Sequence, residues 1–295
     1  MGLFAMCMEC HKELGHPSFE PFLVPYFEER ILEFTCSRGH KNVQVIQSQK
    51  FEALLESGAN ALLSGFTLEA SASFSAALER LYEFAFKVLI IDSGIKKDIY
   101  EEMFKVMARQ SERQLGGFLA MHLIKFGTPY IPKNSISEFR NSVIHKGFIP
   151  KTKEAEDFCS KVYHEIFEIT EKLESKFPEA LQKTLLADLE ERFQKIDPKI
   201  SKSTGTGCLF FSLSRKDKKN KFHNALESFK NEQRIIENAM PGLREMFEKV
   251  KNGTQFQPVA EFEGPEEVTE EAINEFFNSL NERSQENGEK KKEES

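Results

Sequence analysis

The chain has 295 residues, of which 40% are hydrophobic, and this is enough to bury a core and to form about two domains. Its longest apolar run, near residues 84–91, is interrupted by Lys87 and is far shorter than the roughly 18 residues that a membrane span needs. The net charge of −7 comes from residues 261–295, which carry twelve Glu against four Lys and Arg, or −8, so residues 1–260 carry +1.

The first residues lack the pattern of a signal peptide. Cys7, Glu9 and Cys10 interrupt any apolar run at the start of the chain. Five cysteines are also too few and too unevenly placed for a disulfide framework. We therefore expect a soluble protein of the cytoplasm that has no membrane partner.

Two Cys/His pairs near the N-terminus have a spacing typical of zinc sites. The pairs Cys7-x-x-Cys10 and Cys36-x-x-x-His40 lie about 25 residues apart, which lets two knuckles converge on one tetrahedral Zn²⁺. Four protein ligands close the coordination shell and leave no position for an activated water, so we expect a structural zinc. Residues 1–47 are predicted to form a small zinc-ribbon-like module that depends on its metal to fold.

Two alternatives to this zinc site remain open. Cys7 and Cys10 could form a redox pair, although no βαβ pattern follows them. His11 or His16 could also replace His40 as the fourth ligand.

The predicted elements change from strand to helix at about residue 48. The β-rich runs 31–35 and 42–46 predict two strands. In residues 48–177 the apolar periodicity is helical, with one stripe through Phe74, Leu78 and Leu81 and a second stripe that includes Val162. Further helices are predicted for residues 97–110 and 114–126, so this region should be a helical bundle. Cys159 lies on the second stripe and should pack in its core.

A short helix is predicted after the breakers Gly127, Pro129 and Pro132. Ser135-x-x-Glu138 matches a capping box, which marks the start of a helix. Gly147 is typical of the position just after the last turn and predicts where this helix ends.

The pattern is weaker beyond residue 177. Residues 178–280 are predicted to be a mostly helical region, with a short strand in 205–213 and helices near 222–238, 241–250 and 266–280. Residues 281–295 are charged and lack apolar side chains, so we expect a disordered tail. Residues 199–222 hold seven Lys and Arg against one Asp, with phenylalanines between them, which predicts either a basic surface for phosphates or a solvated loop.

The segment with the most functional information is Glu138-Phe-Arg-Asn-Ser-Val-Ile-His-Lys-Gly147. Arg140 and Asn141 precede His145 by five and four positions. An Arg and a His at this distance occur by chance in many helices. Three further features support the interpretation of this Arg and His as a functional motif. They are the adjacent asparagine, the glycine at the helix end and the long amphipathic helices on both sides.

This segment resembles the Arg-polar-x-x-x-His signature of the HEPN superfamily, and the resemblance covers about residues 48–177. It implies an all-helical domain in that region. Together with the patterns at the two ends, we expect a mainly α chain, with a HEPN-like helical bundle, a small N-terminal β-rich zinc ribbon and a helical C-terminal extension. The resemblance also implies a homodimer in which two motifs meet and cleave RNA without a metal ion, leaving a 2′,3′-cyclic phosphate.

The residue types suit that chemistry. His145 can remove a proton from the ribose 2′-hydroxyl or protonate the leaving 5′-oxygen. Arg140 can hold the phosphate with its planar guanidinium, and Asn141 can orient the phosphate or the histidine. Residues five apart on a helix are offset by about 140°, so we do not expect Arg140 and His145 of one chain to lie side by side, and a site shared across a two-fold axis is a natural remedy.

Weaker candidates for substrate binding surround this set. On the first long helix, Glu79, Arg80 and Glu83 could line the same cleft, but Glu83 and Lys87 are also spaced as an ordinary ion pair. The remaining candidates are basic: Lys146, Lys216, Lys218 and Lys219.

Two functions are consistent with these patterns. The first is an endoribonuclease, a toxin or an anti-phage defence effector, whose partners would be RNA and an antitoxin or other defence protein. The second is a non-catalytic module in which the zinc ribbon and the helical bundle bind RNA or protein. A hydrophobic motif surface that buries Arg140 against Glu residues would favour the second.

Overall fold

The computed structural model describes residues 2–252 except 17, 19, 21, 26, 27, 109 and 217. They belong to one compact unit, Met1–Thr254. The described residues are mainly helical, as predicted, with one small three-stranded sheet and one two-stranded antiparallel sheet. The expected helix at 266–280 and the expected disordered tail at 281–295 lie outside the described residues.

The N-terminal part is built from short strands around one short helix. Strands β1 (Gly2–Ala5) and β2 (Phe22–Pro25) pair antiparallel, and α1 (Met8–Leu14) lies between them in the chain. Strands β3 (Ile31–Thr35) and β4 (Lys41–Ile46) form the antiparallel pair that the alternating runs predict. All of β4 after its first residue is buried, because helices and a third strand cover it.

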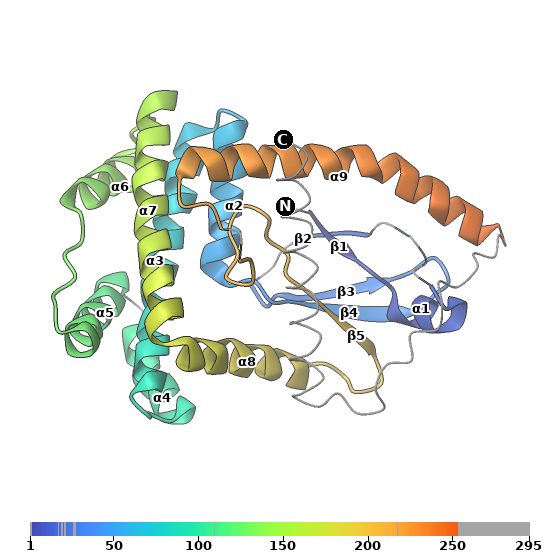
Figure 1. Cartoon of the computed structure of the whole chain (residues 1–295), viewed down its shortest axis with the longest axis horizontal. Coiled ribbons are helices and arrows are strands. Elements are labelled where there is room, and N and C mark those ends of the chain that lie inside the picture. The colour runs from blue at the N-terminus through green and yellow to red at the C-terminus, as the bar shows by residue number, and fades with distance from the viewer. Residues whose placement is uncertain are drawn as a thin grey trace, which may run out of the picture. The chain divides into compact units, whose positions relative to one another are not determined.

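The third strand comes from far along the chain. Strand β5 (Ser201–Gly205) pairs parallel with β4, so the sheet order is β3-β4-β5 (Figure 1). The strand that the sequence predicts at 205–213 is therefore displaced toward the N-terminus. The reason is that three amides of this segment bond instead to two buried carboxylates of α2: Glu56 accepts from Leu209 and Phe210, and Glu52 accepts from Leu213.

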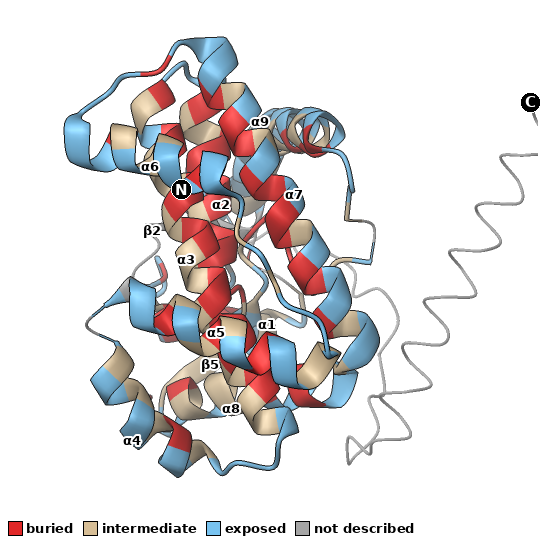
Figure 2. Cartoon of the chain, turned by 90° about the vertical axis from the view of Figure 1, so that its left-hand side faces the viewer, coloured by how far each residue is buried: buried red, intermediate tan, exposed pale blue. Residues whose placement is uncertain are grey.

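The helical part is organised around α3 (Thr67–Asp92), nearly all of whose residues are buried or half-buried (Figure 2). The helices that pack on it are α2 (Lys50–Leu63), α5 (Ser111–Phe126), α6 (Asn134–Lys146), α7 (Thr152–Lys176) and α8 (Pro178–Gln194). The short helix α4 (Lys97–Met107) also contacts α3. Cys159 is fully buried in this core, as expected.

The C-terminal segment completes the same core. Phe210, Phe211 and Phe222 are buried, and all three rings pack around Tyr163 of α7. The last helix, α9 (Phe222–Lys251), is continuous through Pro241, where the sequence predicts two separate helices. No helix in the described part of the chain is both long enough and apolar enough to cross a membrane.

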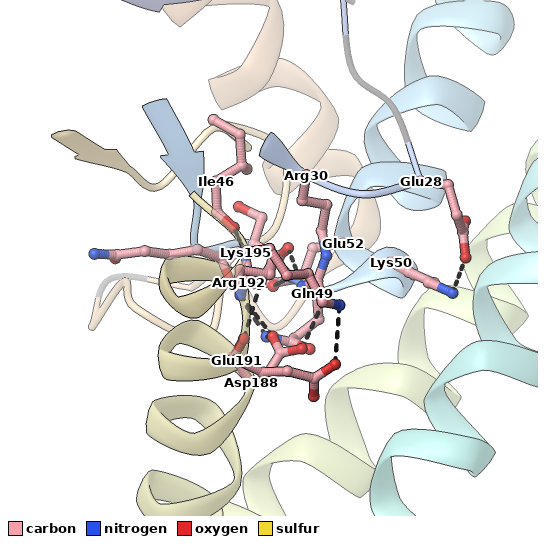
Figure 3. A network of polar contacts seen from close by, with 12 residues as sticks. Glu28, Arg30, Ile46, Gln49, Lys50, Glu52, Asp188, Glu191, Arg192 and Lys195 are labelled. Atoms are coloured by element: carbon pink, nitrogen blue, oxygen red, sulfur yellow. Dashed lines mark hydrogen bonds and ion pairs between the residues drawn. The ribbon is translucent and has the colours of Figure 1, made fainter. Parts of the chain in front are cut away.

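A buried ionic network joins the sheet to α8 (Figure 3). Asp188 accepts hydrogen bonds from Arg30, at 2.7 Å, and from Arg192, at 2.6 Å. Arg30 also donates to the carbonyl oxygen of Ser48, and Arg192 donates to that of Ile46 at the end of β4. The two guanidinium groups thus satisfy carbonyl groups at the strand end that would otherwise be buried without partners.

Candidate functional site

The N-terminal part brings Cys7, Cys10, Cys36 and His40 together, as the spacing predicts, in a cluster that could hold a metal ion. The four ligand atoms all lie within 4.8 Å of one another. The Cys10 and Cys36 sulfurs are 3.7 Å apart, and His40 Nδ1 is 3.4 Å from Cys10 Sγ and 3.8 Å from Cys7 Sγ. Tetrahedral zinc requires about 3.8 Å between two sulfurs and about 3.6 Å between sulfur and nitrogen. The donor set and its geometry therefore fit one zinc ion.

Local structure holds each ligand of this cluster. Cys7 is the N-cap of α1 and accepts from the Cys10 amide, while Asn42 Nδ2 donates to the same sulfur at 3.1 Å. The His40 amide donates to Cys36 Sγ. Hydrogen bonds of this kind stabilise thiolates, the form that binds a metal.

The histidine ligand has a carboxylate behind it. His40 Nε2 lies 3.2 Å from Glu13 Oε1, which leaves Nδ1 facing the three sulfurs. A carboxylate on the other ring nitrogen fixes the tautomer and makes the ligand nitrogen more basic. The alternative ligands His11 and His16 are not members of the cluster.

Without a bound cation, the Cys10 thiol is held in its protonated form. Burial and the neighbouring Cys7 and Cys36 raise the pKa of the Cys10 thiol well above its usual range. A bound divalent cation reverses this effect because it favours the thiolate.

The Arg-Asn-x-x-x-His segment lies on α6, on the side of the central helices away from the metal cluster (Figure 1). The helix ends where predicted: Gly147 has a φ of 65°, and the Phe148 amide bonds to the carbonyl of Ser142. Its start differs from the prediction. Lys133 is the N-cap, the helix begins at Asn134, and the expected capping box of Ser135 and Glu138 is not formed because Ser135 already lies inside the first turn.

The three motif side chains meet through Arg140. Its Nη1 donates to Asn141 Oδ1 at 3.1 Å and lies 3.3 Å from His145 Nε2. The expectation that Arg140 and His145 of one chain would not lie side by side is therefore wrong. The 140° offset describes the Cα positions, whereas the long arginine side chain extends along the helix surface to the imidazole.

The second terminal nitrogen of Arg140 binds a neighbouring helix. Nη2 donates to Glu79 Oε1 of α3 at 2.6 Å, and the two side chains are 25% and 30% exposed. Arg140 therefore faces a carboxylate on one side and the histidine on the other. The guanidinium is held in place but is still open to solvent.

A cavity of about 270 Å³ opens beside Arg140, between α3, α5 and the start of α6. Of the three candidates on α3, Glu79 lines it, whereas Arg80 and Glu83 do not. Arg80 and Glu83 bind each other, and Arg80 also donates to Gln114. The cavity is lined by Ser75, Leu78, Glu79, Tyr82, Glu112, Leu115, Pro132, Lys133, Ile136, Ser137, Arg140 and Asn141.

Sequence reasoning missed the polar chain behind this cavity. The Tyr82 and Tyr130 hydroxyls are 3.2 Å apart, and Tyr130 donates to Glu165 at 2.5 Å. The other oxygen of Glu165 lies 2.7 Å from Lys133 Nζ. These residues come from two helices and the loop before α6 and share no motif spacing, so no signal in the sequence could have linked them.

The basic stretch at 199–222 does not present its aromatic rings to solvent, as a surface that stacks nucleic-acid bases would. Its phenylalanines belong to the core, and the Lys218 side chain is only 7% exposed and forms an ion pair with Glu174. Lys216 and Lys219 are exposed on the surface, as is Lys146 at the end of α6. The buried rings cannot serve as a platform for bases.

Comparisons with protein-family models, with curated proteins and with solved structures give no match to this chain.

Proposed function

We propose that the protein is a HEPN-type endoribonuclease that cleaves RNA without a catalytic metal ion. The observation that carries the proposal is the convergence of Arg140, Asn141 and His145 on one exposed helix surface, with His145 Nε2 3.3 Å from the arginine. A phosphate bound by Arg140 would lie within reach of the imidazole. Attack by a 2′-hydroxyl needs a base and a phosphate-binding group close together, and His145 and Arg140 would supply them.

The reaction would proceed by transesterification. A neutral His145 has one ring nitrogen without a proton and removes the proton of the ribose 2′-hydroxyl. The 2′-oxygen attacks phosphorus, the bond from phosphorus to the 5′-oxygen breaks, and that oxygen receives a proton. Arg140 stabilises the charge on the other phosphate oxygens. The products are a 2′,3′-cyclic phosphate end and a 5′-hydroxyl end.

A second copy of the chain would supply the other proton-transfer group. Exposed apolar side chains surround the motif: Ile144 is 45% exposed, Phe148 41% and Ile149 71%. Burying them against their counterparts would bring two α6 helices together across a two-fold axis, with one His145 as the base and the other as the acid.

The cysteine cluster would bind one structural zinc ion. Three thiolates and one imidazole fill a tetrahedral shell and leave no open position for a water. Its place away from α6 agrees with a role in folding of the N-terminal part (Figure 1).

One observation favours a second function, a non-catalytic binding module. The ion pair of Arg140 with Glu79 occupies one side of the guanidinium, and an anionic neighbour weakens its attraction for phosphate. In this alternative the motif helix serves only as a contact surface.

Incubation of RNA with matched variants in EDTA tests the proposal. Purified protein, shown to retain its zinc, is incubated with total tRNA and mRNA, and the end chemistry of the fragments is determined. Wild type and His164→Ala, which alters an exposed histidine on α7, should both produce cyclic phosphate ends, and His145→Ala should not. Inactivity of all three proteins while RNA is still bound would favour the binding module.

A further inference from the structure

The cavity beside Arg140 has no net charge. Its charged lining residues are two cations and two carboxylates: Lys133, Arg140, Glu79 and Glu112. Lys133 is already bound to buried Glu165, and Arg140 to Glu79. A phosphate would require an excess of positive charge. The cavity is therefore better suited to a neutral, polar ligand.

The size and the apolar lining of the cavity suit an aromatic ring. Leu78, Tyr82 and Ile136 are buried side chains at the cavity, and Leu115 and Pro132 are half-buried beside it. The volume of about 270 Å³ lies just below the roughly 300 Å³ at which pockets for drug-sized ligands begin. One nucleobase fits within this volume, whereas several nucleotides would not.

One carboxylate at the cavity is available for a ligand. Glu112 at the start of α5 is exposed and makes no hydrogen bond or ion pair within the described part of the chain. Its two oxygens accept hydrogen bonds and cannot donate when ionised. Of the four RNA bases, only guanine presents two adjacent N–H donors, N1–H and the N2 amino group, on one edge. A carboxylate can accept both at once.

We propose that this cavity binds a guanine base next to the scissile phosphate and makes cleavage guanine-specific. Arg140 lies between the cavity and His145, so a base in the cavity would place its own phosphate at the motif. Glu112 would accept from the guanine edge. The Asn141 amide, whose oxygen accepts from Arg140, would donate to the guanine O6 through Nδ2. The inference rests on the proposed ribonuclease function for the position of the phosphate, but not for binding of the base.

Binding of mononucleotides tests the cavity independently of cleavage. Wild-type protein is dialysed to equilibrium against the 3′- and 5′-monophosphates of guanosine, adenosine, cytidine and uridine. The affinities for the 3′ and 5′ forms of guanosine monophosphate, compared with each other, show on which side of the phosphate the base lies. Guanosine monophosphate should bind about 10-fold more tightly than the other three, as expected for one bidentate contact. Equal binding of all four nucleotides, or binding of none, would overturn the proposal.

Two variants and one control locate that binding. Glu112→Gln should remove the preference for guanine, and Ser137→Phe should fill the cavity and abolish binding. Glu102→Gln removes an exposed carboxylate on α4 that does not line the cavity, and it should bind like wild type. If Glu112→Gln and Ser137→Phe both bound guanosine monophosphate as wild type does, the cavity would not be the site.

Cleavage of an RNA with random sequence separates the two proposals. Sequencing of the cut ends should show guanine at one fixed position beside the cut. Cleavage without a base preference would overturn the guanine pocket but leave the ribonuclease intact. Guanine binding without cleavage would support the pocket and contradict the ribonuclease.

Discussion

Arg140 on α6 and Glu79 on α3 form an ion pair, with Nη2 2.6 Å from Oε1, and both residues line the cavity beside the motif. The pair fixes the motif arginine to the central helix of the core. It also places a negative charge where an RNA phosphate would have to approach. The same contact therefore has opposite consequences for the position of Arg140 and for its affinity for phosphate.

Substitution of Glu79 should separate these two consequences. In Glu79→Gln, we expect RNA to bind several-fold more tightly because a carboxylate no longer repels the phosphate. The turnover number should fall by about 10-fold because the guanidinium is held less firmly. The measurement is RNA affinity and single-turnover cleavage, with Glu69→Gln, an exposed carboxylate of α3, as the control. No change in either quantity would show that the pair serves neither purpose.

Glu13 should strengthen zinc binding without being a ligand. Glu13→Gln removes the carboxylate 3.2 Å from His40 Nε2, and zinc affinity should fall by roughly 10-fold to 100-fold. Competition with a chromophoric chelator measures this affinity. Glu33→Gln, an exposed residue of β3, should bind zinc as wild type does. Cys36→Ser should instead lose most of its zinc, and a normal zinc content in that variant would contradict the assigned ligand set.

The buried network around Asp188 should make stability depend on pH. Burial alone would raise the pKa of Asp188, but Arg30 and Arg192 outweigh this effect and hold the pKa below its usual range. An acid with a lowered pKa in the folded state stabilises the protein fully above its unfolded pKa of about 3.9. That contribution is lost as the pH falls through the folded pKa.

Asp188→Asn should therefore lower the free energy of unfolding by about 3 to 5 kcal/mol at pH 7, because it leaves two buried guanidinium groups without their anion. The difference from wild type should shrink as the pH falls below about 4. Urea unfolding between pH 7 and pH 3 measures it. Asp92→Asn, which breaks the partly exposed pair with Lys125, should lower the free energy of unfolding by under about 1 kcal/mol. Equal effects of the two variants would argue against an important buried network.

Alanine substitution at two helical glycines should change the stability of the protein in opposite directions. A Cβ at Gly58 of α2 would lie 2.5 Å from the ring of Phe74, which is fully buried and cannot move away. Gly58→Ala should therefore lower stability by about 1 to 3 kcal/mol. A Cβ at Gly116 of α5 would meet nothing within 4 Å, so Gly116→Ala should raise stability by up to about 1 kcal/mol. Thermal unfolding of both variants provides the comparison, and a stabilising Gly58→Ala would contradict the close packing of α2 on α3.

Local patterns in the sequence were enough to predict many elements. The strands at 31–35 and 42–46, most helices of the bundle and the end of α6 at Gly147 follow from period, propensity and glycine placement. The metal cluster was predictable for a related reason. Two ligand pairs with fixed internal spacing can converge only if the chain between them folds back.

Contacts between distant segments decided the rest. The partner of β4 comes from residues 201–205, and the buried carboxylates of Glu52 and Glu56 take the amides that a strand at 205–213 would have used. The pairing of Arg140 with Glu79 likewise joins two helices 61 positions apart.

The sequence by itself therefore determined most of the helices and strands, the two Cys/His pairs and the helix that carries the Arg-Asn-x-x-x-His set. Only the tertiary structure decided which strand completes the sheet, which carboxylate faces Arg140 and which side chains enclose the cavity beside it. The physical reason is that helix and strand periodicity act between residues a few positions apart. Buried hydrogen bonds and ion pairs form wherever packing brings a donor to an acceptor, and sequence distance does not limit them.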